Sequence, residues 1–161
     1  MFVSDTDKYK ESIMLKLDSQ PFKINLNRAL AELQIKKAKL VELNKSEAYL
    51  KRQLTLISRQ VKLAEKELNR SNQLGTQRVA AKKSVEAAET ELIMQKKNYI
   101  DVKQQLRILP SQIEQAKASV KKAQADLAIA EKNLKDTIIK VPFASQIISK
   151  NVEIGQYVQP G

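Results

Sequence analysis

Apolar side chains recur along most of this chain in two interleaved series, each with a spacing of seven residues. Within each half of the chain the two series are offset by three or four residues, which places both on one face of an α-helix. About seven heptads in each half keep this pattern, which predicts two coiled-coil helices over residues ~20–73 and ~77–135. The residues at the centre of this predicted seam are Leu43, Leu50, Ile57, Leu92, Tyr99 and Leu106.

The two seams mirror each other when the chain is folded between residues 74 and 75. Residues whose numbers add up to 149 then face each other, so that Leu50 meets Tyr99. Gly75 suits the C-terminal stop of the first helix, and Thr76 suits the N-cap of the second. The prediction is an antiparallel hairpin whose arms are each ~80 Å long at ~1.5 Å per residue.

Pro110 is the one proline well inside a predicted helix. The sequence Ser111–Glu114 has the form of a capping box, which would begin a new helix. The heptad phase nevertheless continues across the proline, so we expect a kinked helix rather than a break.

Two flanking segments differ in character from the helices: residues 13–18 alternate apolar and polar positions, and the segment after Asp136 is rich in Ile and Val. Both flanks are therefore expected to form β-structure.

Composition removes most kinds of chemistry. The 161 residues contain no Cys and no His, which excludes a Cys/His zinc site, a thiol nucleophile and a histidine base. With three glycines the chain has no glycine-rich phosphate loop, and no apolar run approaches the ~18 residues of a membrane span. Acidic residues alternate with lysines and are best interpreted as exposed ion-pair partners. We therefore expect no catalytic residue, no metal ligand and no cofactor.

The net charge of +11 raises nucleic acid as a partner. Against this, the lysines are spread over both helices and interleaved with Glu, and Tyr49 and Tyr99 are placed on or near the seam rather than among them. We therefore expect no nucleic-acid partner, although a basic nucleic-acid-binding hairpin stays open as an alternative. Two charged seam residues, Lys36 and Glu47, are interpreted as long side chains that extend from weak layers toward solvent.

The flanks carry two further motifs. Before the first helix, Leu17-Asp18 is followed by Pro21-Phe22. After the second helix the pattern is Thr-x-Ile-x-x-Pro-Phe, then Val-x-x-Gly-x-x-Val and a closing Gly. Together these motifs resemble the hairpin flanks of HlyD-type periplasmic adaptors, also called membrane fusion proteins, over essentially the whole chain. The matching positions in the second flank are Thr137, Ile139, Pro142, Phe143, Val152, Gly155, Val158 and Gly161.

The resemblance implies a mainly α fold, in which a long coiled-coil hairpin (residues 19–136) separates the two halves of a lipoyl-like β module (residues 2–18 and 137–161). The family binds no lipoate. Its membrane anchor or signal, β-barrel and membrane-proximal domain have no counterpart here, so the chain is expected to be a fragment of a longer protein.

The resemblance also implies a function without catalysis. Adaptors of this family act in the periplasm, attached to the inner membrane, as a homo-oligomeric ring. They link an inner-membrane transporter of the RND, ABC or MFS type to a TolC-type outer-membrane channel, for efflux or secretion. The alternative from the heptads alone is a structural coiled-coil spacer or interaction protein unrelated to export.

The hairpin tip, about residues 72–78, is where the family contacts the channel. The family's tip pattern is Arg-x-x-x-Leu followed by a Ser several residues later. Arg70 and Leu74 match its first two positions, and Ala80 or Ala81 stands where the Ser is usual. The expected channel-docking residues are Arg70, Leu74, Gly75, Thr76, Gln77 and Arg78.

Overall fold

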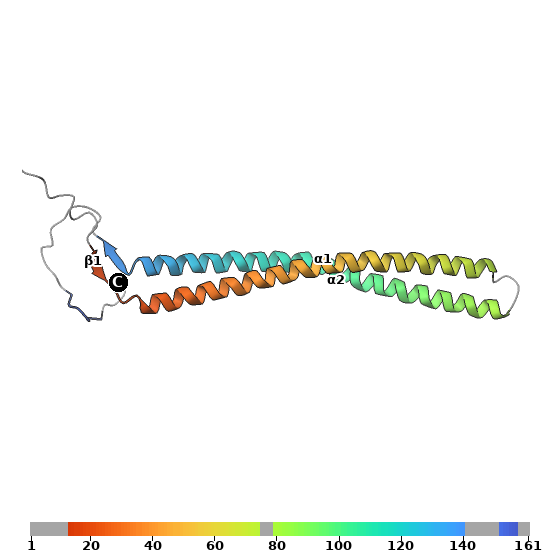
Figure 1. Cartoon of the computed structure of the whole chain (residues 1–161), viewed down its shortest axis with the longest axis horizontal. Coiled ribbons are helices and arrows are strands. Elements are labelled where there is room, and N and C mark those ends of the chain that lie inside the picture. The colour runs from red at the N-terminus through yellow and green to blue at the C-terminus, as the bar shows by residue number, and fades with distance from the viewer. Residues whose placement is uncertain (1–12, 75–78, 141–151, 158–161) are drawn as a thin grey trace, which may run out of the picture. The chain divides into compact units, whose positions relative to one another are not determined.

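The structure is a computed structural model that describes residues 13–74, 79–140 and 152–157. Its elements follow the order β1 (Ile13–Lys16), α1 (Gln20–Leu74), α2 (Val79–Lys135) and β2 (Ile138–Lys140). The two long helices pack as a hairpin, and the two strands form a small antiparallel sheet (Figure 1). The predicted mainly α hairpin is therefore confirmed, and the helix bounds lie within two residues of those expected from the heptads.

Contacts divide the chain into two compact units. One consists of residues 29–127 and contains the greater part of both helices. The other combines residues 1–28 with residues 128–161 and contains both strands. Each unit is described separately below.

Burial within the unit of residues 29–127 follows the heptads. Every described seam position is buried or half-buried, whereas nearly all other helical positions are exposed. One helix of a coiled-coil pair covers only two rows of side chains on the other helix, so the interface is narrow and continuous. The predicted seam is thus confirmed, and its most deeply buried members are Leu33, Ile57, Leu92, Val102, Leu109, Ile113 and Ala123.

The pairing of the helices differs from the prediction by about one heptad. The predicted register places Ser84 level with Glu65, with Lys96 a further ~18 Å along α2. In the structure Glu65 Oε1 lies 3.2 Å from Lys96 Nζ, which excludes that register because two side chains cannot span such an offset. A shift of one heptad reduces the axial offset of this pair to ~7.5 Å. The long Glu and Lys side chains bridge that distance, since both incline toward the N-terminus of their own helix.

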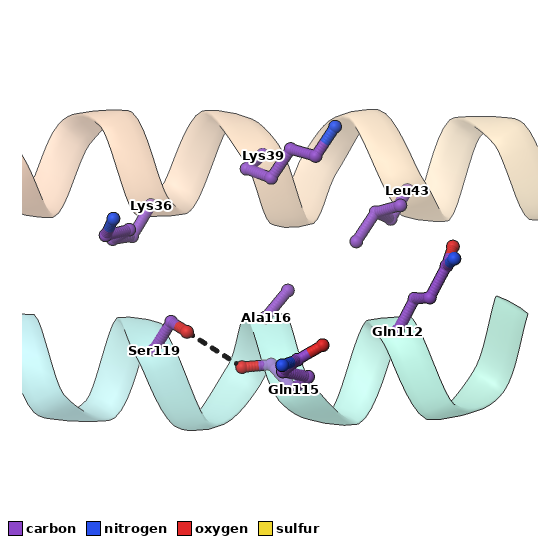
Figure 2. Close-up of a pocket in the computed structure, with 7 residues that line it drawn as sticks. All are labelled: Lys36, Lys39, Leu43, Gln112, Gln115, Ala116 and Ser119. Atoms are coloured by element: carbon purple, nitrogen blue, oxygen red, sulfur yellow. Dashed lines mark hydrogen bonds between the residues drawn. The ribbon is translucent and has the colours of Figure 1, made fainter.

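A second group of residues supports the shifted register. One pocket is lined by Lys36, Lys39 and Leu43 from α1 and by Gln112, Gln115, Ala116 and Ser119 from α2. Figure 2 shows Lys36 beside Ser119 and Leu43 beside Gln112, whereas the predicted register placed Ala116 level with Leu33. The shifted register places Leu50 level with Leu106 and Ile57 level with Tyr99. The predicted pairing of Leu50 with Tyr99 is therefore wrong.

The α2 helix continues through Pro110 without interruption. The break that a capping box at Ser111 would have produced is thus absent, and the expected continuity is confirmed. Pro110 lies on an exposed position. The carbonyl of Leu106, which loses its helical N–H partner to the proline, is therefore on a side where water can replace that hydrogen bond.

The other unit joins the two flanks through an antiparallel strand pair. The aligned residues are Leu15 with Ile139 and Lys16 with Ile138, with an irregularity between Leu15 and Ile13. Leu17 N–H extends the pairing by donating a 2.8 Å hydrogen bond to the carbonyl of Thr137. The expected β-structure at both flanks is confirmed for these strands. In the rest of the predicted lipoyl-like module, residues 152–157 form a turn and no strand, and residues 2–12, 141–151 and 158–161 lie outside the described residues.

Local contacts define where helices end in this unit. The Asp18 carboxylate accepts a 2.9 Å hydrogen bond from Gln20 N–H, which satisfies an unpaired donor at the start of α1. At the end of α2, the buried Thr137 hydroxyl donates to the carbonyl of Leu134 at 2.7 Å. Gly155 has a φ of +87° in a turn closed by Gln156 N–H and the carbonyl of Glu153, a backbone conformation that favours glycine.

Candidate functional site

Among the expected channel-docking residues, Arg70 is the one whose side chain the structure describes. It lies on the exposed surface of the last turns of α1, with its guanidinium 3.8 Å from the Glu67 carboxylate. Such a long, exposed contact contributes little free energy and leaves most guanidinium donors available. Leu74 is the last residue of α1, and the predicted contacts of Gly75, Thr76, Gln77 and Arg78 lie outside the described residues.

Other basic side chains surround this end of the hairpin. Lys66 on α1 and Lys82 and Lys83 on α2 are exposed, and none has a carboxylate within 4 Å in the described part of the chain. This end of the hairpin thus presents these basic side chains together with exposed acidic ones, Glu67 on α1 and Glu86 and Glu89 on α2. Cationic donors of this kind form charge-assisted hydrogen bonds with carboxylates and carbonyls.

Arg70 takes no part in the packing of the two helices. The neighbouring seam residue, Ser71, is buried, and Leu68 is half-buried, whereas Arg70 projects on the exposed side. A substitution at Arg70 is thus expected to change the surface and to leave the seam intact. The six residues predicted for the centre of the seam are all buried or half-buried, so their role in the structure is packing. They are Leu43, Leu50, Ile57, Leu92, Tyr99 and Leu106.

An open pocket of about 400 Å³ lies between the helices, far from the tip in sequence (Figure 2). It forms where the seam is weak, because the Lys36 side chain turns to Glu32 at 2.8 Å and Ala116 on α2 is small. Lys39 is likewise paired with Glu42 at 2.9 Å, and the Ser119 hydroxyl donates to the carbonyl of Gln115. Both cations and the hydroxyl already have partners, so the pocket presents no activated group.

The second charged seam residue behaves as predicted. Glu47 is half-buried and its carboxylate forms an ion pair with Lys51, one turn further along α1. The shifted register places it level with Leu109 rather than Val102. The Glu47 carboxylate is thus paired within α1, while the aliphatic part of its side chain packs in the seam.

Acidic residues do not gather into a metal site within the described ranges, where no group of three potential ligands occurs. Several of them instead meet cations or amides, as in the pairing of Glu65 with Lys96 and the 2.8 Å hydrogen bond from the Gln95 amide to Glu91. Among the described helices none is long and apolar enough to cross a bilayer.

Tyr49 is a correction to the sequence interpretation. The sequence places it on or near the seam, but its side chain is exposed on the outer side of α1. Tyr99 is half-buried at the seam as predicted, with Lys103 Nζ 5.7 Å from its ring centroid. The signal that could have separated the two tyrosines is heptad position: Tyr99 belongs to a seam series, and Tyr49 precedes one by a single residue.

Comparison of the chain with models of protein families, with curated proteins and with solved structures finds no match.

Proposed function

We propose that this chain is the hairpin region of a periplasmic adaptor that links an inner-membrane transporter to a TolC-type outer-membrane channel. The adaptor is attached to the inner membrane, assembles as a homo-oligomeric ring, and serves efflux or secretion without catalysis. The transporter belongs to the RND, ABC or MFS type.

One observation carries the proposal. The chain leaves a β-strand at Lys16, runs through two long antiparallel helices, and returns to pair with that same strand at Ile138. A hairpin inserted between two paired strands is the arrangement that the flanking motifs led us to expect for an adaptor. A coiled-coil spacer needs no such strand pair, and the two strands would then have no role.

The hairpin tip supplies the contact with the channel. Each helix is ~80 Å long, so the tip can reach across a wide aqueous gap. Arg70 donates to carboxylates or carbonyls of the channel, and Leu74 adds an apolar contact. A ring of copies multiplies a weak contact made by each tip, which makes a small docking site sufficient.

The test is export by the full-length protein that carries this chain. The double substitution Arg70→Asp with Leu74→Asp is expected to abolish export, because it replaces the guanidinium donor at position 70 by a carboxylate and removes the apolar contact at position 74. Folding is expected to persist, because Arg70 lies off the seam and Leu74 is the last residue of α1. Expression level and the helical circular dichroism signal report on folding.

The matched control is Ile100→Asp with Arg107→Asp, which changes one apolar and one basic side chain, both exposed on α2 away from the tip. Export is expected to stay at the level of the unmodified protein. Full export by the tip variant would contradict the proposal and favour the structural spacer.

A further inference from the structure

The outer side of α1 carries a second ladder of residues with the spacing of a coiled-coil seam. Its members follow one another at intervals of four and three residues, and all lie on the side of α1 turned away from α2. We call this set the outer face. It consists of Lys45, Tyr49, Arg52, Leu56, Arg59, Leu63 and Lys66.

The outer face has one apolar row and one basic row. The apolar row is Tyr49, Leu56 and Leu63, whose side chains are 65%, 59% and 65% exposed. The basic row is Lys45, Arg52, Arg59 and Lys66, and each member is exposed. Large apolar side chains at successive heptad positions form a row along which a second helix can pack.

The basic row has no counter-charge within the described part of the chain. No carboxylate lies within 4 Å of any of its members, although seven ion pairs form elsewhere on the two helices and at the end of α2. The sequence explains this, because neither Arg52 nor Arg59 has an acidic residue three or four positions away. Four cations aligned over ~32 Å of helix are thus available to a partner.

We propose that the outer face of α1 docks an acidic amphipathic helix of a partner protein. The partner helix has an apolar row that packs on Tyr49, Leu56 and Leu63, and an Asp/Glu row that pairs with the basic row. The alternation of four and three residues suits a helix running alongside α1, because both helices then repeat every heptad. This inference is independent of the tip and of its proposed channel.

Charge and geometry favour this occupant over others. A second copy presenting the same face would bring two basic rows together, which repels, and neither helix carries Asp or Glu at two successive heptad positions that could face the basic row. A membrane-surface helix needs a broad apolar face, whereas here the apolar row is one residue wide and is bordered on its other side by Ser46, Gln53 and Gln60. A nucleic-acid backbone would satisfy the basic row and leave the apolar row exposed to water.

The test uses the complete chain and a soluble four-heptad helical peptide. One face of the peptide alternates Leu and Glu at intervals of three and four residues, and a control peptide has the same composition in scrambled order. Fluorescence anisotropy measures the dissociation constant. Saturable 1:1 binding of the patterned peptide, at least ~10-fold tighter than that of the scrambled peptide, is expected.

Two double variants test the contributions of the basic row and the apolar row to binding separately. Arg52→Glu with Arg59→Glu, and separately Leu56→Gln with Leu63→Gln, are each expected to weaken binding at least ~10-fold. A peptide with Lys only at the Glu positions that face residues 52 and 59 is expected to restore binding to the charge-reversed variant, because Lys45 and Lys66 stay basic. The controls are Lys37→Glu with Lys121→Glu and Ile93→Gln with Ile100→Gln, exposed residues away from the outer face, which are expected to change binding less than ~2-fold.

Three outcomes overturn the proposal. The first is equal binding of the patterned and scrambled peptides. The second is loss of affinity in the control variants as large as in the outer-face variants. The third is tighter binding to anionic phospholipid vesicles or to a single-stranded oligonucleotide than to the patterned peptide, which would assign the outer face to a membrane or to nucleic acid.

Discussion

The inner and outer sides of α1 repeat with the same heptad spacing but meet different surroundings. On the inner side both rows are apolar at most layers, and they pack against α2 with Leu33 and Ile57 buried. On the outer side one row is apolar and the other is basic, and all seven residues stay exposed. Heptad spacing alone therefore does not decide which side of the helix is buried.

The difference lies in the free energy of desolvation. Packing α2 on the outer face would remove four cations from water with no carboxylate to receive them, a cost that three apolar side chains cannot offset. The inner rows carry two charges, Lys36 and Glu47, and each is paired on its own helix. The two helices therefore pair through the inner side of α1, and the outer face stays available for a partner.

The largest expected effect compares two adjacent residues of α1. Ile57 is 9% exposed at the seam and Leu56 is 59% exposed on the outer face. Ile57→Ala is expected to lower the free energy of unfolding by about 2–4 kcal/mol, because it leaves a cavity between the helices. Leu56→Ala is expected to change it by less than about 0.5 kcal/mol. Urea unfolding followed by circular dichroism measures both, and equal losses would contradict the division into inner and outer sides.

A smaller effect is expected from removing a charge from the seam. Glu47→Leu replaces a half-buried carboxylate by an apolar side chain that fills the layer opposite Leu109, and is expected to raise the free energy of unfolding by about 1 kcal/mol. Glu42→Leu is the matched control, because Glu42 also pairs with a lysine on its own helix but lies off the seam. A loss of stability in Glu47→Leu would show that the charge supports the pairing.

Helix bounds and seam were accessible to sequence reasoning because both depend on local periodicity. The apolar rows stop near Leu74 and resume near Val79, and Asp18 and Thr137 occupy the two outer ends of the hairpin. The flanking strands could be predicted from the alternation of apolar and polar residues before α1 and from the Ile and Val residues after α2. Each of these signals lies within a few residues of the element that it predicts.

The register could not be derived in the same way. Sliding one helix by a heptad returns every seam residue to a seam position, so Leu50 finds an apolar partner in either Tyr99 or Leu106. What distinguishes the two registers is a long-range contact, such as that between Glu65 and Lys96, which no local pattern encodes. Matching the two seams with a fold point between residues 74 and 75 gave the wrong one of two nearly equivalent pairings.

The candidate docking surfaces show a similar limit. Arg70 was singled out by its resemblance to a tip motif, and the structure finds it exposed and off the seam. The outer face was missed because Tyr49 was assigned to the neighbourhood of the seam, which hid the row that it forms with Leu56 and Leu63. Exposure of consecutive heptad positions is the observation that reveals this row, and it requires the structure.

Disulfide cross-linking tests the pairing on which the contrast between the two sides of α1 depends. The chain has no native cysteine, so Leu50→Cys with Leu106→Cys introduces a single thiol pair. Level residues in this register have Cα atoms close to the ~7 Å limit for a disulfide, so mild oxidation of the monomer should cross-link this pair rapidly. Leu50→Cys with Tyr99→Cys, offset by ~10 Å along the axis, should cross-link at least tenfold more slowly. Faster cross-linking of Leu50→Cys to Tyr99→Cys would contradict the register and the pairing of the two helices described here.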